Sequence, residues 1–247
     1  MVAGPGWQRI GPDPAIAEWA RAALPMARRA VSQTDQPLRC GGTWAVGLDL
    51  LDNDQAGAVA GCDLPWAAIG LDPEPLHRAQ LSVIYPGYPR PWDGETAAGF
   101  RFRQTRDAAH LDGLLPFGPQ KRRMIKEPHG WILGIALTDC AASPLVVYEG
   151  SHLLIQTALK AVLVGHAPQN WGDVDVTDAY QSARAKVFET CRRIEVPIML
   201  GQATLLHRLT IHGVAPWASE MTPPPDGRII AYFRPQVSSV QGWLLAA

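Results

Sequence analysis

The chain has 247 residues, 47% of them hydrophobic, and its 22 Lys and Arg against 23 Asp and Glu give a formal net charge of −1. This is globular composition with enough length for a large core, and it excludes collagen-like and disordered chains. The near-zero charge gives no reason to expect binding to nucleic acid or to a membrane surface. The 22 Pro and 23 Gly indicate many short elements and loops, which argues against a bundle of long helices.

The spacing of the cysteines and the N-terminal residues indicate in which cellular compartment the protein is expected. The chain has 4 cysteines, widely spaced and without a CxxC pair, which argues against a disulfide scaffold or a zinc ribbon and favours free thiols. The N-terminus lacks a basic segment followed by an apolar one, and no window approaches 18 uninterrupted apolar residues. We therefore expect a soluble cytoplasmic protein without a membrane span.

The first part of the chain is predicted to be helical. Asp13 followed by Pro14 is typical of a helix start, and apolar residues then recur at helical spacing. Pro25 is expected to kink or end this helix near Leu24. A shorter helical segment is expected to begin at Asp63–Trp66 by the same logic.

From residue 79 the pattern changes to short strands, which favour a sandwich, jelly roll or barrel. A loop rich in Pro and Gly follows the first strand, and we expect residues 86–99 to form a lid. Two helices, Ser151–Val164 and Thr177–Cys191, interrupt the strand pattern, and a loop with three prolines spans Gly213–Gly227. The predicted strands are Ala79–Tyr85, Phe100–Ala108, Trp131–Leu137, Leu145–Tyr148, Ile194–Met199, Ala203–Ile211 and Arg228–Phe233.

Two histidines and one aspartate are the candidate metal ligands. His110 and Asp112 follow the predicted strand Phe100–Ala108 and share one side because the side-chain period of a strand is two. His212, at the end of another predicted strand, can supply a third ligand. Two imidazoles and one carboxylate suit a non-haem Fe(II) oxygenase, and they also suit catalytic zinc. Arg228, on the last strand, can pair with a carboxylate of a co-substrate.

The order of these motifs resembles the phytanoyl-CoA dioxygenase-like family. The resemblance rests on HLDG at 110–113, the stretch Tyr148–His152, the pair His212-Gly213, and Arg228, and it covers about residues 79–235. It implies a double-stranded β-helix, a jelly-roll and cupin-like core, that uses Fe(II), 2-oxoglutarate and O2. It also implies that His110, Asp112 and His212 bind the iron.

The resemblance assigns further roles. Arg228 matches the residue that binds the distal carboxylate of 2-oxoglutarate, although Arg234 points to the same side of the strand and stays an alternative. The prolines at 223–225 account for the length of the loop between His212 and Arg228 as a surface loop. His152 matches a structural turn histidine and is not expected to bind metal.

The implied activity is hydroxylation of a small organic molecule, with release of succinate and CO2. Halogenating relatives lack the ligand carboxylate, so Asp112 implies hydroxylation, desaturation or ring chemistry. Gln104 shares parity with His110 and is expected to face the barrel interior, where it contacts 2-oxoglutarate or substrate or is a satisfied core amide. Two basic clusters favour an anionic substrate or are simply solvated surface; they are Arg101, Arg103, Arg106, Lys121, Arg122, Arg123 and Lys126.

The sequence thus predicts one mainly β domain with flanking helices, of the α+β class, over residues 1–247. Within it, residues 1–78 are a helical capping part, 79–150 and 192–236 the jelly-roll core, and 151–191 a helical insertion. Two alternatives stay open on the same fold: a non-catalytic cupin-like binding protein and a zinc-dependent hydrolase. The expected partner is a small molecule, with no nucleic acid and no membrane, and the oligomeric state is not predicted.

Overall fold

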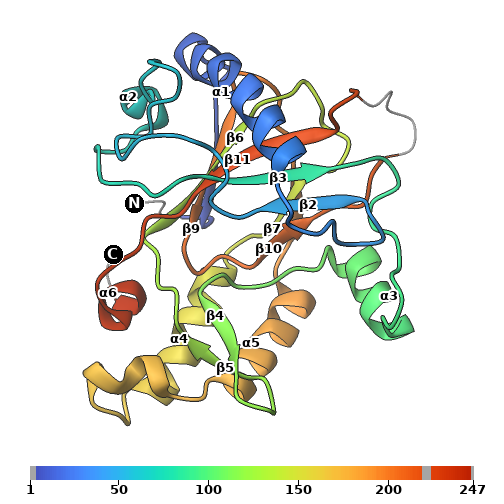
Figure 1. The fold of residues 1–247 in the computed structure, drawn as a ribbon. Coiled ribbons are helices and arrows are strands. Elements are labelled where there is room, and N and C mark those ends of the chain that lie inside the picture. Colours follow the sequence, from blue (N-terminus) through green and yellow to red (C-terminus); the bar gives the residue numbers. More distant parts are fainter. Residues whose placement is uncertain (1–3, 219–223, 246–247) are drawn as a thin grey trace.

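The computed structural model describes residues 4–218 and 224–245, in which two antiparallel sheets lie between helices (Figure 1). The larger sheet has the order β1-β9-β6-β11-β3-β2 and the smaller one β10-β7-β8. The strands of the larger sheet are β1 (Trp7–Ile10), β9 (Ala203–His207), β6 (Trp131–Ala136), β11 (Arg228–Phe233), β3 (Gln80–Ile84) and β2 (Trp44–Gly47). Those of the smaller sheet are β10 (His212–Val214), β7 (Leu145–Tyr148) and β8 (Arg193–Val196).

The chain winds between the two sheets as a double-stranded β-helix. After β3 in the larger sheet, the segment around His110 joins the edge of the smaller sheet by a bridge to β10. The chain then places β6 in the larger sheet, β7 and β8 in the smaller one, β9 in the larger, β10 in the smaller and β11 in the larger. The predicted fold class is therefore confirmed. The N-terminal part, expected to be helical, also supplies β1 and β2, the two outer strands of the larger sheet.

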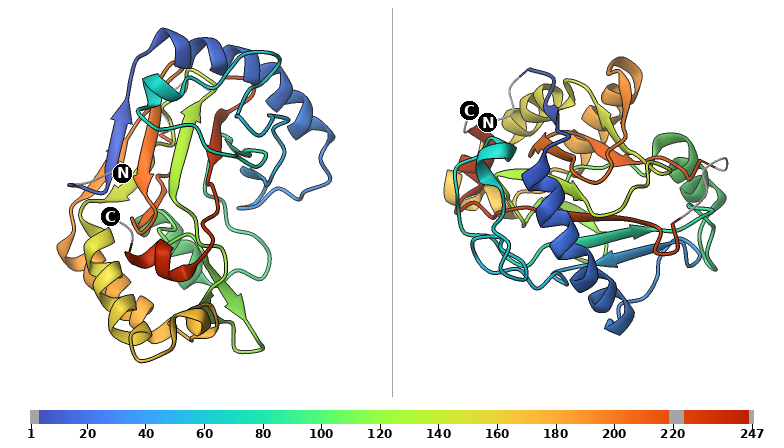
Figure 2. Two further views of the ribbon diagram at one scale, coloured as in Figure 1. Left: turned by 90° about the vertical axis from the view of Figure 1, so that its left-hand side faces the viewer. Right: turned by 90° about the horizontal axis from the view of Figure 1, so that it is seen from above.

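The core forms three apolar layers because strand side chains alternate between two faces. Inward residues of β6 and β9 meet those of β7 and β8 between the sheets, as in the contact of Ile132 and Leu206 with Leu145 and Val147. The outer face of the larger sheet packs on α1 (Pro14–Gln33) through Trp19 and its neighbours. Figure 2 shows α1 on one side of the strands and α4 and α5 on the other.

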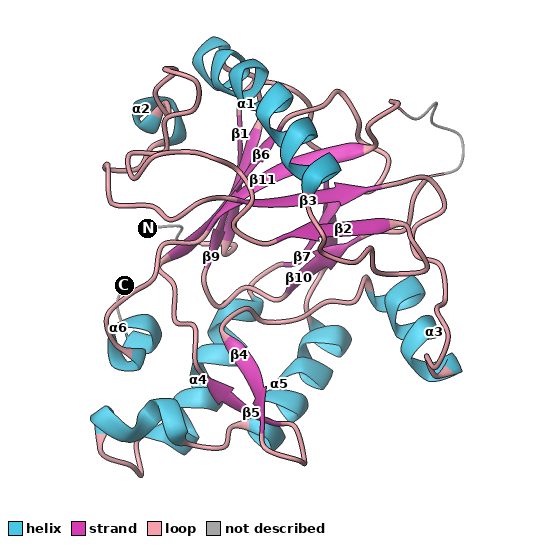
Figure 3. Ribbon diagram, viewed as in Figure 1, coloured by secondary structure: helices cyan, strands magenta, loops and turns pink. Residues whose placement is uncertain are grey.

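The outer face of the smaller sheet is covered by helices and a hairpin. Val146 and Tyr148 of β7 contact apolar residues of α4 (Ser151–Leu163), α5 (Thr177–Thr190) and α6 (Val240–Leu245). The hairpin of β4 (Leu114–Phe117) and β5 (Arg122–Ile125) lies beside these helices and apart from both sheets (Figure 3). The remaining elements are α2 (Trp66–Ile69), α3 (Ala97–Arg106) and the 3-10 helix η1 (Pro168–Asp173). No helix in the described ranges is long and apolar enough to cross a membrane.

Several sequence expectations about elements need correction. The segment predicted as the strand Phe100–Ala108 is the helix α3, whose cap is the Thr96 side chain accepting a hydrogen bond from the Gly99 amide. Helix α1 continues through Pro25 to Gln33. The predicted strand Ala203–Ile211 ends at His207, and His212 begins a strand of the other sheet. The prolines predicted to form a surface loop lie partly outside the described residues, since 219–223 are not described.

Candidate metal centre

The site forms where two segments about one hundred residues apart pair with each other. The amide of His110 donates to the carbonyl of His212 at 2.9 Å, and the amide of His212 donates back at 3.1 Å. Gly213 permits this close pairing, because a Cβ atom at that position would lie 2.2 Å from the carbonyl oxygen of Asp107. The close approach of the Asp107 carbonyl therefore explains why a glycine follows His212 in the sequence.

The three predicted ligands come together at this pairing. His110 Nε2 lies 3.1 Å from Asp112 Oδ1, and His212 Nε2 lies 3.9 Å from Asp112 Oδ2. The two imidazole ring centroids are 5.0 Å apart. Candidate ligand atoms of all three residues lie within 4.8 Å of one another, and no other such group occurs among the residues that the structure describes. Two imidazoles and one carboxylate on one side can hold a metal ion with positions left open.

Backbone carbonyls fix the imidazoles in the tautomer that a metal requires. His110 donates through Nδ1 to the carbonyl of Ala108 at 3.1 Å, and His212 donates through Nδ1 to the carbonyl of Thr210 at 2.9 Å. With Nδ1 protonated, Nε2 is the atom that each imidazole in its neutral form offers to a metal, and in both residues it lies toward Asp112. In the metal-free protein, Nε2 of His110 carries a proton and donates it to Asp112 Oδ1. Such outer hydrogen bonds are the usual support of metal-binding histidines.

The charges of the site depend on burial and on mutual contact. Burial lowers the pKa of His212 to about 4, so this imidazole is neutral at pH 7. Burial opposes ionisation of Asp112, but the hydrogen bond from His110 and the charges of His110 and Arg234 hold its pKa well below the usual range. Partial burial opposes protonation of His110, but the contact with Asp112 outweighs it and raises the pKa of His110.

The site is open on one side. The side chain of His110 is 50% exposed, while those of Asp112 and His212 are 12% and 11% exposed. The segment is held from behind by α5, because the Tyr180 hydroxyl accepts a hydrogen bond from the Leu111 amide. A ligand can therefore approach the group from the His110 side.

Arg228 begins β11 and is buried, and no described residue is a hydrogen-bond partner of its guanidinium. Arg228 is 1% exposed, and none of its guanidinium nitrogens Nε, Nη1 and Nη2 has a hydrogen-bond partner among the described residues. It shares the inward face of β11 with Ile230, which packs on Ala136 of β6 and on Ile198. A buried guanidinium is costly without an anion to receive its five N–H groups. The charge of Arg228 thus has no compensating hydrogen-bond acceptor among the described residues.

Arg234, the other candidate for that role, has its partners within the protein. Its Nη1 donates to Asp112 Oδ2 at 3.0 Å and its Nη2 to Gln80 Oε1 at 2.6 Å. The sequence placed Arg234 on the same side as Arg228 but contained no signal for its contact with Asp112, which depends on how β3, β11 and the segment around residue 112 meet.

Other sequence-predicted residues lie elsewhere. Gln104 is on the exposed side of α3, so the expectation that it faces the barrel interior is wrong. His152 packs against His207, with ring centroids 4.8 Å apart and the ring planes tilted by 46°. The neighbouring Ser151 shows what the turn does, since its Oγ accepts a hydrogen bond from the Ile211 amide next to His212.

The basic clusters are largely engaged in contacts within the protein. Arg103 pairs with Glu95, Arg122 with Asp175 and Asp178, and Lys126 with Asp173. They therefore lend little support to an anionic substrate.

No model of a known family matches this chain, and no curated protein matches it. Among solved structures it is similar to the non-heme alpha ketoglutarate dependent carbocyclase SnoK from nogalamycin biosynthesis, with 15% identity, a TM-score of 0.47 and coverage of 96% of this chain and 84% of that chain. It is also similar to the non-heme alpha ketoglutarate dependent epimerase SnoN from nogalamycin biosynthesis, with 15% identity, a TM-score of 0.48 and coverage of 93% of this chain and 76% of that chain. A third similar structure is EctD from S. alaskensis with 2-oxoglutarate and 5-hydroxyectoine. Its identity to this chain is 15%, the TM-score is 0.43, and the match covers 95% of this chain and 73% of that chain. Because these TM-scores lie below 0.5, the functional argument rests on the site itself.

Proposed function

We propose that this protein is an Fe(II)- and 2-oxoglutarate-dependent oxygenase that hydroxylates a small organic molecule. The observation that carries the proposal is the combination of a two-histidine, one-carboxylate group with a buried arginine that has no partner in the described structure. The donor set suits Fe(II), with positions left for a chelating co-substrate and O2. The unpaired guanidinium suits the far carboxylate of such a co-substrate.

Each residue then has a definite task. His110, Asp112 and His212 would hold the metal, through Nε2 of the imidazoles and the carboxylate of Asp112. Arg228 would bind the distal carboxylate of 2-oxoglutarate and so orient the molecule before reaction. Iron held there would supply the chemistry that couples conversion of 2-oxoglutarate and O2 to succinate and CO2 with insertion of the second oxygen atom into a C–H bond of the substrate. The alternative function, a zinc hydrolase that uses the same three ligands, gives no reason for the buried guanidinium of Arg228.

The test is an anaerobic titration of the metal-free protein with Fe(II) and 2-oxoglutarate, following the visible charge-transfer band of chelated iron. We expect the band in the wild type and its loss in His110→Ala. Arg228→Met should need at least roughly 30-fold more 2-oxoglutarate, because removing one partner of a buried charge pair costs about 2 kcal/mol or more.

The control is Arg234→Met at saturating Fe(II), which should keep the wild-type dependence on 2-oxoglutarate. A wild-type protein that binds Fe(II) but gives no band with 2-oxoglutarate would overturn the proposal and favour a zinc hydrolase or a binding protein. A normal titration of Arg228→Met together with a weakened one of Arg234→Met would move the anchor to Arg234.

A further inference from the structure

Arg234 lies just after β11 and connects a predicted metal ligand to β3. Its Nη1 donates to Asp112 Oδ2 at 3.0 Å and its Nη2 to Gln80 Oε1 at 2.6 Å. The side chain of Arg234 is 25% exposed and that of Asp112 is 12% exposed. The contact is therefore a charge-assisted hydrogen bond that is largely shielded from water, where such bonds are strong.

The two oxygens of Asp112 have different surroundings. Oδ1 lies 3.1 Å from His110 Nε2, whereas Oδ2 receives the hydrogen bond from Arg234 and lies 3.9 Å from His212 Nε2. A carboxylate that is held through one oxygen is fixed in rotation and presents the other oxygen as a ligand. The contact with Arg234 thus leaves Oδ1, on the His110 side, as the oxygen without a guanidinium partner.

We propose that Arg234 is a positioning residue that orients Asp112 so that the metal is bound through one carboxylate oxygen, Oδ1. Gln80 supports Arg234 in this role. The inference rests on the metal site of the proposed function, but it does not depend on the identity of the co-substrate. It gives Arg234 a task different from that of Arg228, whose guanidinium is free of partners among the described residues.

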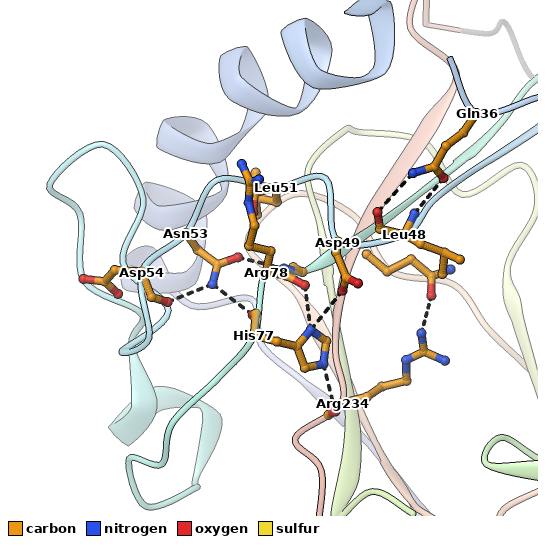
Figure 4. Close-up of polar contacts among 11 residues, drawn as sticks. Gln36, Leu48, Asp49, Leu51, Asn53, Asp54, His77, Arg78 and Arg234 are labelled. Atoms are coloured by element: carbon orange, nitrogen blue, oxygen red, sulfur yellow. Dashed lines mark hydrogen bonds and ion pairs between the residues drawn. The ribbon is translucent and has the colours of Figure 1, made fainter. Parts of the chain in front are cut away.

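The backbone of Arg234 is also fixed, as Figure 4 shows. His77 donates through Nε2 to the carbonyl oxygen of Arg234 at 3.0 Å. On its other side the His77 ring contacts the carbonyl oxygen of Arg78 at 2.7 Å and Asp49 Oδ1 at 3.2 Å. The arginine is therefore held at its main chain and at its guanidinium, which is the arrangement that a precise outer contact requires.

Charge and positioning make opposite predictions for this residue. If Arg234 acted only as a positive charge, its removal would tighten the binding of a divalent cation, because a repulsion would disappear. If it positions Asp112, its removal weakens metal binding, since the carboxylate can rotate. Loss of an outer hydrogen-bond partner of a metal ligand typically lowers affinity about 10- to 100-fold.

The experiment measures the dissociation constant of Co(II), with its visible absorption spectrum as the readout and without 2-oxoglutarate or O2. We expect Arg234→Met to bind Co(II) about 10- to 100-fold more weakly than the wild type. Arg234→Lys should lose less, because one ammonium can reach Asp112 but does not bridge it to Gln80. Gln80→Leu should shift the constant in the same direction by a smaller factor. Arg228→Met, the matched control at the other end of β11, should bind Co(II) like the wild type.

Unchanged or tighter Co(II) binding by Arg234→Met would overturn the inference, as would an equal loss in Arg228→Met. The circular dichroism and melting temperature of each metal-free variant show whether it folds. If Arg234→Met does not fold, Arg234→Lys and Gln80→Leu decide, and wild-type affinity in both would overturn the inference. Failure of the oxygenase proposal looks different, because the wild type would then bind metal but give no charge-transfer band with 2-oxoglutarate.

Discussion

His207 and His152 form a second pair of buried imidazoles, on the outer side of β9 and at the start of α4. Their residues are 8% and 6% exposed. His207 Nδ1 accepts a hydrogen bond from the Leu209 amide, and the main chain of His207 pairs with the carbonyl of Gly6. Burial, with the neighbouring charge of Arg208, lowers the pKa of His207 to about 3. This histidine is therefore a structural group that must stay neutral in the folded protein.

The consequence is a loss of stability in acid. The pKa of His207 in the folded protein, about 3, lies below its ordinary value of 6.5, so only the unfolded chain binds this proton in between. The stabilisation is complete above pH 6.5 and decreases as the pH falls from 6.5 toward 3, by up to about 1.4 kcal/mol per pH unit. In His207→Asn, whose amide oxygen can accept the Leu209 hydrogen bond, the unfolding free energy from urea denaturation at pH 7, 6, 5 and 4 should decline less steeply. Parallel pH profiles in both proteins would contradict the assignment.

At the scale of elements, the turn between α3 and the segment that carries the candidate ligands His110 and Asp112 decides where His110 lies. Asp107 and Ala108 both adopt the left-handed conformation, with φ of 58° and 52°. The Asp107 carboxylate is 1% exposed and accepts two hydrogen bonds from Arg193 of β8, at 2.8 and 2.7 Å. This ion pair ties the start of that segment to the smaller sheet.

Asp107→Asn should destabilise the protein by roughly 1.5–3 kcal/mol, the range for hydrogen bonds to charged groups. Asparagine tolerates the left-handed conformation, so the effect reports the lost charge. The matched control is Glu195→Gln, which removes the other carboxylate partner of Arg193; its side chain is 50% exposed, so the loss should stay below about 1 kcal/mol. The free energy of unfolding in urea measures both, and equal losses would show that the Asp107 pair has no special importance.

At the scale of the whole molecule, the metal centre joins parts of the chain that fold far apart in sequence. His110 and Asp112 precede β4, whereas His212 begins β10, and the two segments meet only when both have joined the smaller sheet. The unfolded chain has no such preformed group. Metal binding should therefore stabilise the folded state as a whole.

Saturation with Co(II) or anaerobic Fe(II) at one hundred times the dissociation constant should add about 2.7 kcal/mol to the unfolding free energy. For a chain of this length we expect the melting temperature to rise by roughly 5–10 °C, and a chelator should reverse the rise. Differential scanning calorimetry of the wild type and of His212→Ala measures it. The same rise in His212→Ala would place the metal elsewhere.

The sequence was sufficient for elements whose signals are local. The predicted strand Trp131–Leu137, the predicted helix Ser151–Val164 and the predicted Asp13 cap follow from apolar spacing and capping chemistry. The structure has a strand at Trp131–Ala136, a helix at Ser151–Leu163 and the Asp13 cap of α1. It failed for α3, where phenylalanine and arginine alternate as in a strand. There Arg103 is buried against Glu95 and Phe102 packs on Phe188 of α5, so distant contacts stabilise a helix.

By itself, the sequence determined which side chains are chemically able to form the site: His110, Asp112, His212 and Arg228 were predicted from residue type and order. Only the tertiary structure decided how they are supported. Three features depend on the register between β3, β11 and the smaller sheet: the carbonyls that fix both imidazoles, the lack of a hydrogen-bond partner for Arg228 among the described residues, and the contact of Arg234 with Asp112. The prediction that Gln104 faces the barrel interior failed for the same reason. It assumed the alternating sides of a strand, whereas Gln104 lies on the helix α3. The residue types determine which chemistry a side chain can perform, whereas its hydrogen-bond partners depend on packing between segments that are far apart in the sequence.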